Sequence, residues 1–204
     1  MRNLDEAVAK IEIELDEKDQ IREIALKSSR AIIRLAGGAL KGVHRDEDVG
    51  AHLSELKDEV SRLSSLLAEH PDLAHSGYVE SAFQEFAEVC ITMNIIKEDD
   101  VPLPEEVGVG SVPYLLALGD TVGELRRLSL EALRRGDTVK ANHFLDRMED
   151  LYHALIRFNY PDAVVAIRHK QDVARSLLEK TRGDVAVASS AKRLHDRLDK
   201  FMEE

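Results

Sequence analysis

Residues 83–96 read FQEFAEVCITMNII, and this stretch decides the fold class. Nine of its fourteen residues are apolar, and none is proline or glycine. On a helix the apolar residues cover the whole circumference, which is typical of a helix that lies deep in a core or is shared with another subunit. The stretch therefore predicts a buried helix whose few polar residues need partners.

The rest of the chain has the same helical period, and its five prolines fall between the periodic segments. Aromatic residues make up only 4% of the chain, and evenly spaced short strands are absent, which argues against a β-sandwich or barrel. We expect a single all-α domain over residues 1–204, a bundle of about seven helices. The expected helices span residues 4–45 with a bend at Gly37-Gly38, 48–69, 72–97, 111–136, 138–158, 162–182 and a short segment after Gly183.

The composition limits where the protein acts and what it binds. No apolar run approaches the ~18 residues of a membrane span, and the acidic N-terminal segment has no secretory apolar core. We therefore expect a cytoplasmic protein that does not associate with membranes. The single cysteine, Cys90, excludes an intramolecular disulfide and a thiolate zinc site. With a net charge of −11, the chain must meet any nucleic acid through a local basic patch.

Two carboxylates interrupt the apolar helix. Glu85 and Glu88 are three residues apart, so they lie on one face of a helix. Carboxylates on a mostly apolar surface need a cation, an arginine or a metal ion as partner. The spacing alone leaves a metal site and a structural ion pair equally open.

A second pair, Asp120 and Glu124, has the i, i+4 spacing within GDTVGELRR. Taken alone, this pair indicates an ordinary solvated helix face. However, Gly119 and Gly123 stand beside it, and a glycine inside a helix costs about 1 kcal/mol relative to alanine. The glycines indicate close approach by a ligand or another backbone. Four carboxylates from two helices could hold Mg²⁺, which needs only a few protein oxygens.

A row of basic residues marks the expected first helix. Residues 24–45 contain no Asp or Glu. The basic residues fall close to one line if the helix is continuous through Gly37-Gly38, which makes them a candidate track for the phosphates of a nucleic acid. The alternative is a partner for the acidic surface of other helices or subunits. We call Lys27, Arg30, Arg34, Lys41 and Arg45, with His44 beside them, the basic stripe.

At these residues the chain resembles the translin family, and within it the branch of the translin-associated factor X (TRAX). The similarity extends from about Gln20 to Gly183. The segments that carry it are IREIALKSSR (21–30), QEFAE (84–88), VPYLLALGDTVGELRR (112–127), RRGD (134–137) and HFLDRMEDLYHAL (143–155).

The resemblance implies a seven-helix bundle that assembles into a hollow homo-oligomer, an octamer, and binds single-stranded RNA and single-stranded DNA. The TRAX branch is a Mg²⁺-dependent endoribonuclease, with Mn²⁺ as the alternative ion, whose acidic quartet is a Glu-x-x-Glu pair followed by an Asp-x-x-x-Glu pair. By this resemblance the catalytic residues and metal ligands are Glu85, Glu88, Asp120 and Glu124.

Two other functions compete with the nuclease. One is a translin-like particle that binds single-stranded nucleic acid without cutting it, its carboxylates being structural. The other is an all-α nucleotide pyrophosphohydrolase, which also places acidic pairs on two helices around Mg²⁺. That class has an ExxE and an ExxD pattern, whereas Asp120 and Glu124 are four residues apart.

Overall fold

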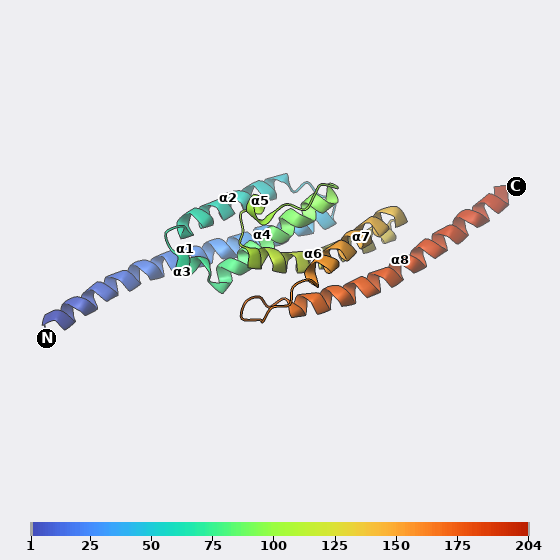
Figure 1. Ribbon diagram of the computed structural model, residues 1–204. Helices are drawn as coiled ribbons and strands as arrows, with labels where there is room; N and C mark the ends of the chain where they lie inside the picture. Colours follow the sequence, from blue (N-terminus) through green and yellow to red (C-terminus); the bar gives the residue numbers. More distant parts are fainter. Residues whose placement is uncertain (1, 204) are drawn as a thin grey trace. The chain divides into compact units, whose positions relative to one another are not determined.

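The computed structural model describes residues 2–203, which form eight helices and no strand (Figure 1). The all-α prediction is therefore confirmed. None of these helices is long and apolar enough to cross a membrane. The helices are α1 (Arg2–His44), α2 (Gly50–Leu67), α3 (Pro71–Ala74), α4 (Gly77–Ile96), α5 (Pro104–Val107), α6 (Ser111–Arg134), α7 (Thr138–Leu155) and α8 (Arg168–Glu203).

The described chain divides into two compact units at Phe86–Ala87, a boundary that lies inside α4. In the first unit α1 packs along α2. The core-facing side of α1 carries small residues such as Ala25, Ala36 and Ala39, which are fully buried and let another helix approach closely. The helix α1 continues through Gly37 and Gly38 without a break.

A hydrogen-bonded clamp joins these two helices. The buried Ser28 of α1 donates a hydrogen bond to Glu59 Oε1 of α2 at 2.6 Å, and Arg62 donates another to Glu59 at 2.5 Å. Burial raises the pKa of Glu59, but the hydrogen bonds from Arg62 and Ser28 and the charge of Arg34 outweigh it, so the pKa lies below its usual range.

The helix expected over 72–97 is interrupted, so that prediction is wrong in its first turn. The short α3 ends at Ala74, and α4 begins at Gly77. The Ser76 hydroxyl donates to the Leu73 carbonyl at 2.7 Å, while the Ser76 carbonyl accepts from Val79 and Glu80. A serine that bonds the local backbone in this way ends one helix and starts the next.

The second unit is formed mainly by α6, α7 and α8, which pack against one another. The turn before α7 follows the expected pattern. Gly136 adopts a φ of +77°, which favours glycine, and the Asp137 side chain caps α7 by accepting from the Lys140 amide at 2.9 Å. At the start of α6, Gly110 is the N-cap rather than Ser111. The preceding loop contains the one-turn helix α5, which the sequence did not predict.

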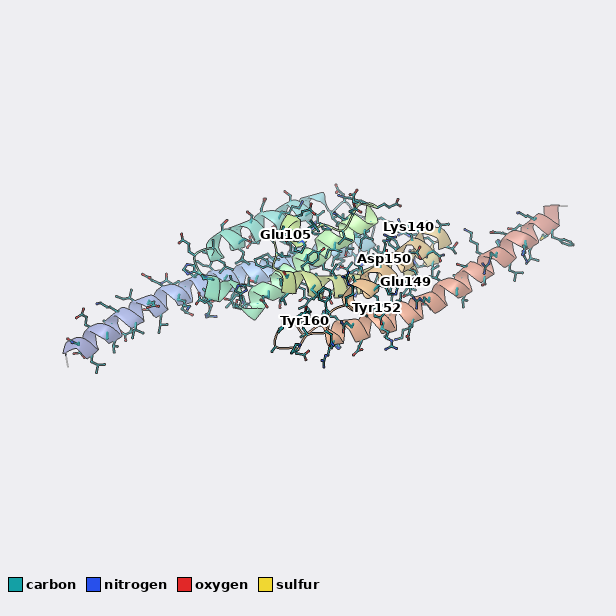
Figure 2. The ribbon with its side chains drawn as sticks, viewed as in Figure 1. Glu105, Lys140, Glu149, Asp150, Tyr152 and Tyr160 are labelled. Atoms are coloured by element: carbon teal, nitrogen blue, oxygen red, sulfur yellow. The ribbon has the colours of Figure 1, made fainter. Side chains whose placement is uncertain are left out.

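The C-terminal helices expected over 162–182 and after Gly183 are one continuous helix, α8, which begins only at Arg168. Residues 156–167, including Tyr160 (Figure 2), form the connection from α7. Gln171 donates hydrogen bonds to the carbonyls of Leu155 and Phe158, both at 2.8 Å, and so ties the end of α7 to α8. Tertiary contacts next to Gly183 outweigh its low helix propensity, because Asp184 pairs with Arg126 of α6 at 3.1 Å.

Candidate functional site: two carboxylate pairs and a basic helix face

The first carboxylate pair lies on α4, which is buried over most of its circumference as predicted. Glu88 is only 6% exposed, and Glu85 is half-buried. Both side chains lie on one face of the helix because they are three residues apart. Burying a carboxylate costs free energy unless it is paired, so the carboxylates on this face need hydrogen-bond donors or cations as partners.

Two hydroxyl groups on the same helix face lack hydrogen bonds. Thr92 is fully buried, and neither its Oγ1 nor the Tyr78 hydroxyl has a hydrogen-bond partner within residues 2–203. Thr92 lies four residues after Glu88, and Tyr78 lies seven before Glu85, so all four side chains share a face. Unsatisfied buried polar groups indicate a missing water or ion. Thr92 lies about 21 Å along the helix from Tyr78, so each hydroxyl needs a partner of its own.

The second carboxylate pair, on α6, has a partner on α8. Asp120 forms an ion pair with Lys170, and both side chains are largely buried, at 26% exposure each. Gly119 explains how Lys170 reaches this position. A Cβ atom on Gly119 would lie 2.9 Å from the Lys170 Cβ, so only glycine leaves room for α8 here. The close approach expected at Gly119 is therefore that of another helix.

Gly119 and Gly123 predict opposite effects on stability. A Gly119→Ala substitution should lower the free energy of unfolding by about 1–3 kcal/mol, because the new Cβ overlaps Lys170. In contrast, a Cβ on Gly123 would meet nothing closer than Leu177 Cδ1 at 3.9 Å. Gly123→Ala should therefore raise stability by up to about 1 kcal/mol through helix propensity. Urea unfolding of both variants tests this, and equal midpoints for the two would contradict the packing described at Gly119.

Glu124 shows that this face of α6 is not an ordinary solvated surface, so that interpretation is wrong. Glu124 is only 8% exposed, and its Oε1 lies 3.1 Å from Nη1 of the exposed Arg127. Two residues later, on the other side of α6, Arg126 donates to Thr181 at 2.7 Å and pairs with Asp184, both on α8. The side of α6 that α8 covers therefore carries Gly119, Gly123 and Arg126, and Glu124 lies about 140° around the helix from Gly119.

The four carboxylates do not form a closed metal cage. Within residues 2–203, no group of three or more His, Cys, Asp or Glu side chains is arranged to hold a metal ion. The quartet stands instead as one pair on α4 and one pair on α6. Mg²⁺ commonly binds through one or two carboxylates and keeps several waters, so each pair suits this ion better than a metal that needs four protein ligands.

The basic stripe has a continuous helix to support it. Lys27, Arg30, Arg34 and Lys41 are all exposed on α1, and at 100° per residue they fall within about 60° of one another. His44 is the last residue of α1, and Arg45 follows the helix, 3.8 Å from Glu47. The structure thus brings the first four together on one face and places the last two at its end.

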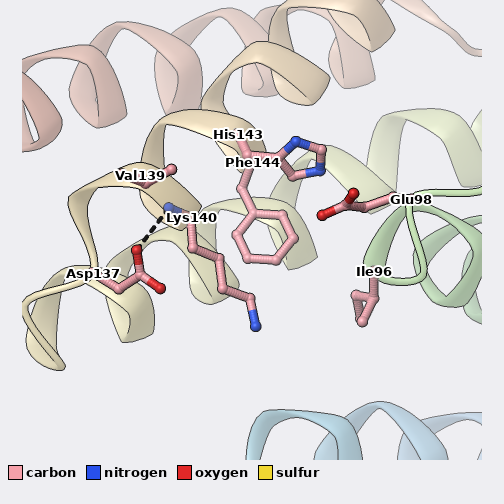
Figure 3. A pocket seen from close by; sticks show the side chains of 7 residues that line it. All are labelled: Ile96, Glu98, Asp137, Val139, Lys140, His143 and Phe144. Carbon is pink, nitrogen blue, oxygen red and sulfur yellow. Dashed lines mark hydrogen bonds between the residues drawn. The ribbon is translucent and has the colours of Figure 1, made fainter.

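The sequence did not indicate two further features of the second unit. Lys170 lies fifty residues from Asp120, so its role as the partner could not be inferred from spacing. A pocket of about 350 Å³ also opens between the end of α4 and the start of α7 (Figure 3). There the buried Nε2 of His143 has no hydrogen-bond partner within the described residues, and the Lys140 ammonium lies 5.9 Å from the centroid of the Phe144 ring.

Comparison with known proteins agrees with this fold. The Translin family model matches residues 14–182. An uncharacterized protein of Methanocaldococcus jannaschii is 34% identical over 189 residues, which cover 90% of this chain and 83% of the relative.

Solved structures agree as well. Apo-NeC3PO has a TM-score of 0.79 at 22% identity and covers 89% of this chain and 96% of its own, a likeness of fold. AfC3PO gives 0.76 at 28% identity, covering 91% and 98%, and its complex with duplex RNA gives 0.73 at 27%, covering 91% and 97%. The chain belongs to the translin family.

Proposed function

We propose that this protein is a Mg²⁺-dependent endoribonuclease that binds and cleaves single-stranded RNA, as in the TRAX branch of the translin family. The observation that carries the proposal is the burial of Glu88 and Glu124 at the positions of the acidic quartet. A buried carboxylate costs folding free energy unless something compensates it. Arg127 supplies part of this compensation for Glu124, and a bound cation would supply more.

Glu85, Glu88, Asp120 and Glu124 would be the ligands of Mg²⁺, each pair supplying carboxylate oxygens to an ion that keeps several waters. Arg127 restrains Glu124, and Lys170 restrains Asp120. The Thr92 hydroxyl, one turn after Glu88, is suited to bond water on the same face of α4. When bound, Mg²⁺, or Mn²⁺ in its place, would polarise the scissile phosphate and lower the pKa of a coordinated water.

The basic stripe would hold the RNA backbone. Its arginines and lysines bond phosphate oxygens, which every sequence offers, so binding would not depend on sequence. A continuous row on one exposed face of α1 suits an extended strand, and single-stranded DNA offers the same phosphates. AfC3PO, at 28% identity, has been solved with duplex RNA, which supports an RNA ligand for this relative.

We further propose that the protein acts as a homo-oligomeric particle, an octamer, in the cytoplasm. A hollow particle would confine the strand near the acidic residues. The basic stripe would face the interior, so that a chain with a net charge of −11 still presents a basic surface to the RNA. Size-exclusion chromatography with light scattering measures this mass directly.

One observation favours a second candidate, an RNA-binding particle that does not cut. The Lys170 ammonium already neutralises Asp120, which is the arrangement of a structural ion pair. Incubation of labelled single-stranded and duplex RNA with Mg²⁺ and with EDTA separates the two functions. The nuclease predicts fragments of the single strand in Mg²⁺ alone, whereas binding with no fragments in either buffer would favour the second candidate.

A further inference from the structure

Four apolar residues lie exposed in a row near the start of α1. Leu4, Val8, Ile11 and Leu15, which we call the N-terminal row, are between 44% and 58% exposed. Their spacing of four, three and four residues is the heptad pattern of helices that pair with another helix. The same register continues along α1 into its fully buried positions, which include Ala25, Ile32 and Ala39. The N-terminal row thus extends a core face beyond the neighbouring α2 and α3 (Figure 1).

A second exposed row lies near the end of α8. Val187, Leu194, Leu198 and Phe201, the C-terminal row, are 52% to 78% exposed. The core-facing side of α8 carries the buried residues Ala174, Leu178, Thr181 and Val185. At 100° per residue, the C-terminal row lies about half a turn away from that side. This row therefore points away from the unit to which α8 belongs and has no apolar partner within residues 2–203.

The two rows have opposite electrostatic surroundings. Residues 4–18 carry six acidic and two basic side chains, a net charge of −4. Residues 187–202 carry four basic and two acidic side chains, a net charge of +2 with histidine neutral. In the heptad register, Glu12 and Glu14 flank the N-terminal row, and Arg197 flanks the C-terminal row. Pairing two N-terminal rows would bring like charges together, whereas pairing unlike rows brings opposite charges together.

We propose that the N-terminal row of one copy of this chain packs against the C-terminal row of a second copy. The rows match in length, because eleven residues separate Leu4 from Leu15 and fourteen separate Val187 from Phe201, or about 17 and 21 Å of helix. Each copy carries one row of each kind, so the contact is head-to-tail and can repeat until a ring closes. The inference rests on the homo-oligomer of the proposed function, but it requires no RNA cleavage.

Serine substitutions in each row test the contact. Ile11→Ser with Leu15→Ser, and separately Leu194→Ser with Leu198→Ser, should reduce the mass measured by light scattering at micromolar protein to that of smaller species. The matched controls are Ile13→Ser on α1, which is 61% exposed but lies off the row, and Val139→Ser on α7, which is 76% exposed. Both should keep the wild-type mass, and far-ultraviolet circular dichroism should show unchanged helix content in every variant.

A charge swap tests which rows pair. Glu12→Arg with Glu14→Arg should weaken assembly, as should Arg197→Glu, and all three changes together should restore the mass. Wild-type mass in both row variants would overturn the proposal, and so would a charge swap without restoration, because that outcome indicates pairing of like rows. A correctly assembled protein that does not cut RNA would contradict the nuclease alone and leave this contact standing.

Discussion

Glu88→Gln is expected to lower Mg²⁺-dependent cleavage of single-stranded RNA by at least about 100-fold. The amide keeps the shape of the buried side chain but removes the negative charge that would hold the ion. Asp120→Asn, Glu124→Gln and Glu85→Gln should have the same direction of effect. RNA binding should remain largely intact, because most affinity comes from contacts between basic residues and phosphates.

The matched control is Glu131→Gln on α6, the helix that also carries Asp120 and Glu124. Hydrogen bonds from Arg134 and Arg135 lower the pKa of Glu131 to about 2, so it too is an ionised, paired carboxylate. It lies outside the quartet, and its variant should cut at the wild-type rate. Circular dichroism separates loss of activity from loss of folding. If all four quartet variants cut as fast as wild type, the active site lies elsewhere.

Removing Arg30 and Arg34 together is expected to weaken RNA binding equally for unrelated single-stranded sequences. Both side chains are exposed on α1, and each would release counterions from the strand when it binds a phosphate. The slope of log affinity against log salt should therefore fall by roughly 1.4, that is, about 0.7 for each phosphate that the variant no longer neutralises. Titration of two unrelated oligoribonucleotides across a salt series measures both effects.

The control for this prediction replaces two exposed arginines of other helices, Arg147 on α7 and Arg175 on α8, by alanine. It removes the same charge from the chain and should leave the slope unchanged. The Arg30/Arg34 variant should also keep its oligomeric mass, because Arg34 acts on Glu59 only at long range and Ser28 and Arg62 still bond that carboxylate. An unchanged slope in the assembled Arg30/Arg34 variant would place the RNA track on another surface.

The buried helix α4 and the ends of most helices could be predicted from the sequence because their signals are local. The all-round apolar pattern of residues 83–96 predicted burial, and α4 is buried. Local signals failed where tertiary contacts decide the outcome. Gly183 reads as a helix end, yet α8 continues because Arg126 pairs with Asp184 and Val185 is buried.

The residues of the candidate site could be named from the sequence, but their burial and their packing partners could not. The i, i+4 spacing of Asp120 and Glu124 is the same on a solvated face and on a covered one. For Asp120 the packing of α8 over Gly119 decides between them, and that packing joins residues about fifty positions apart. The exposed rows on α1 and α8 likewise differ from core positions only in what covers them.

Binding of Mn²⁺, measured by electron paramagnetic resonance of the free ion, tests most directly whether the two carboxylate pairs form a metal site. Wild-type protein should remove Mn²⁺ from solution, and added Mg²⁺ should release it. The double variant Glu88→Gln/Asp120→Asn should bind much less Mn²⁺, whereas Glu131→Gln should bind as wild type. Equal Mn²⁺ binding by the double variant and the wild type would contradict the assignment of these carboxylates as metal ligands.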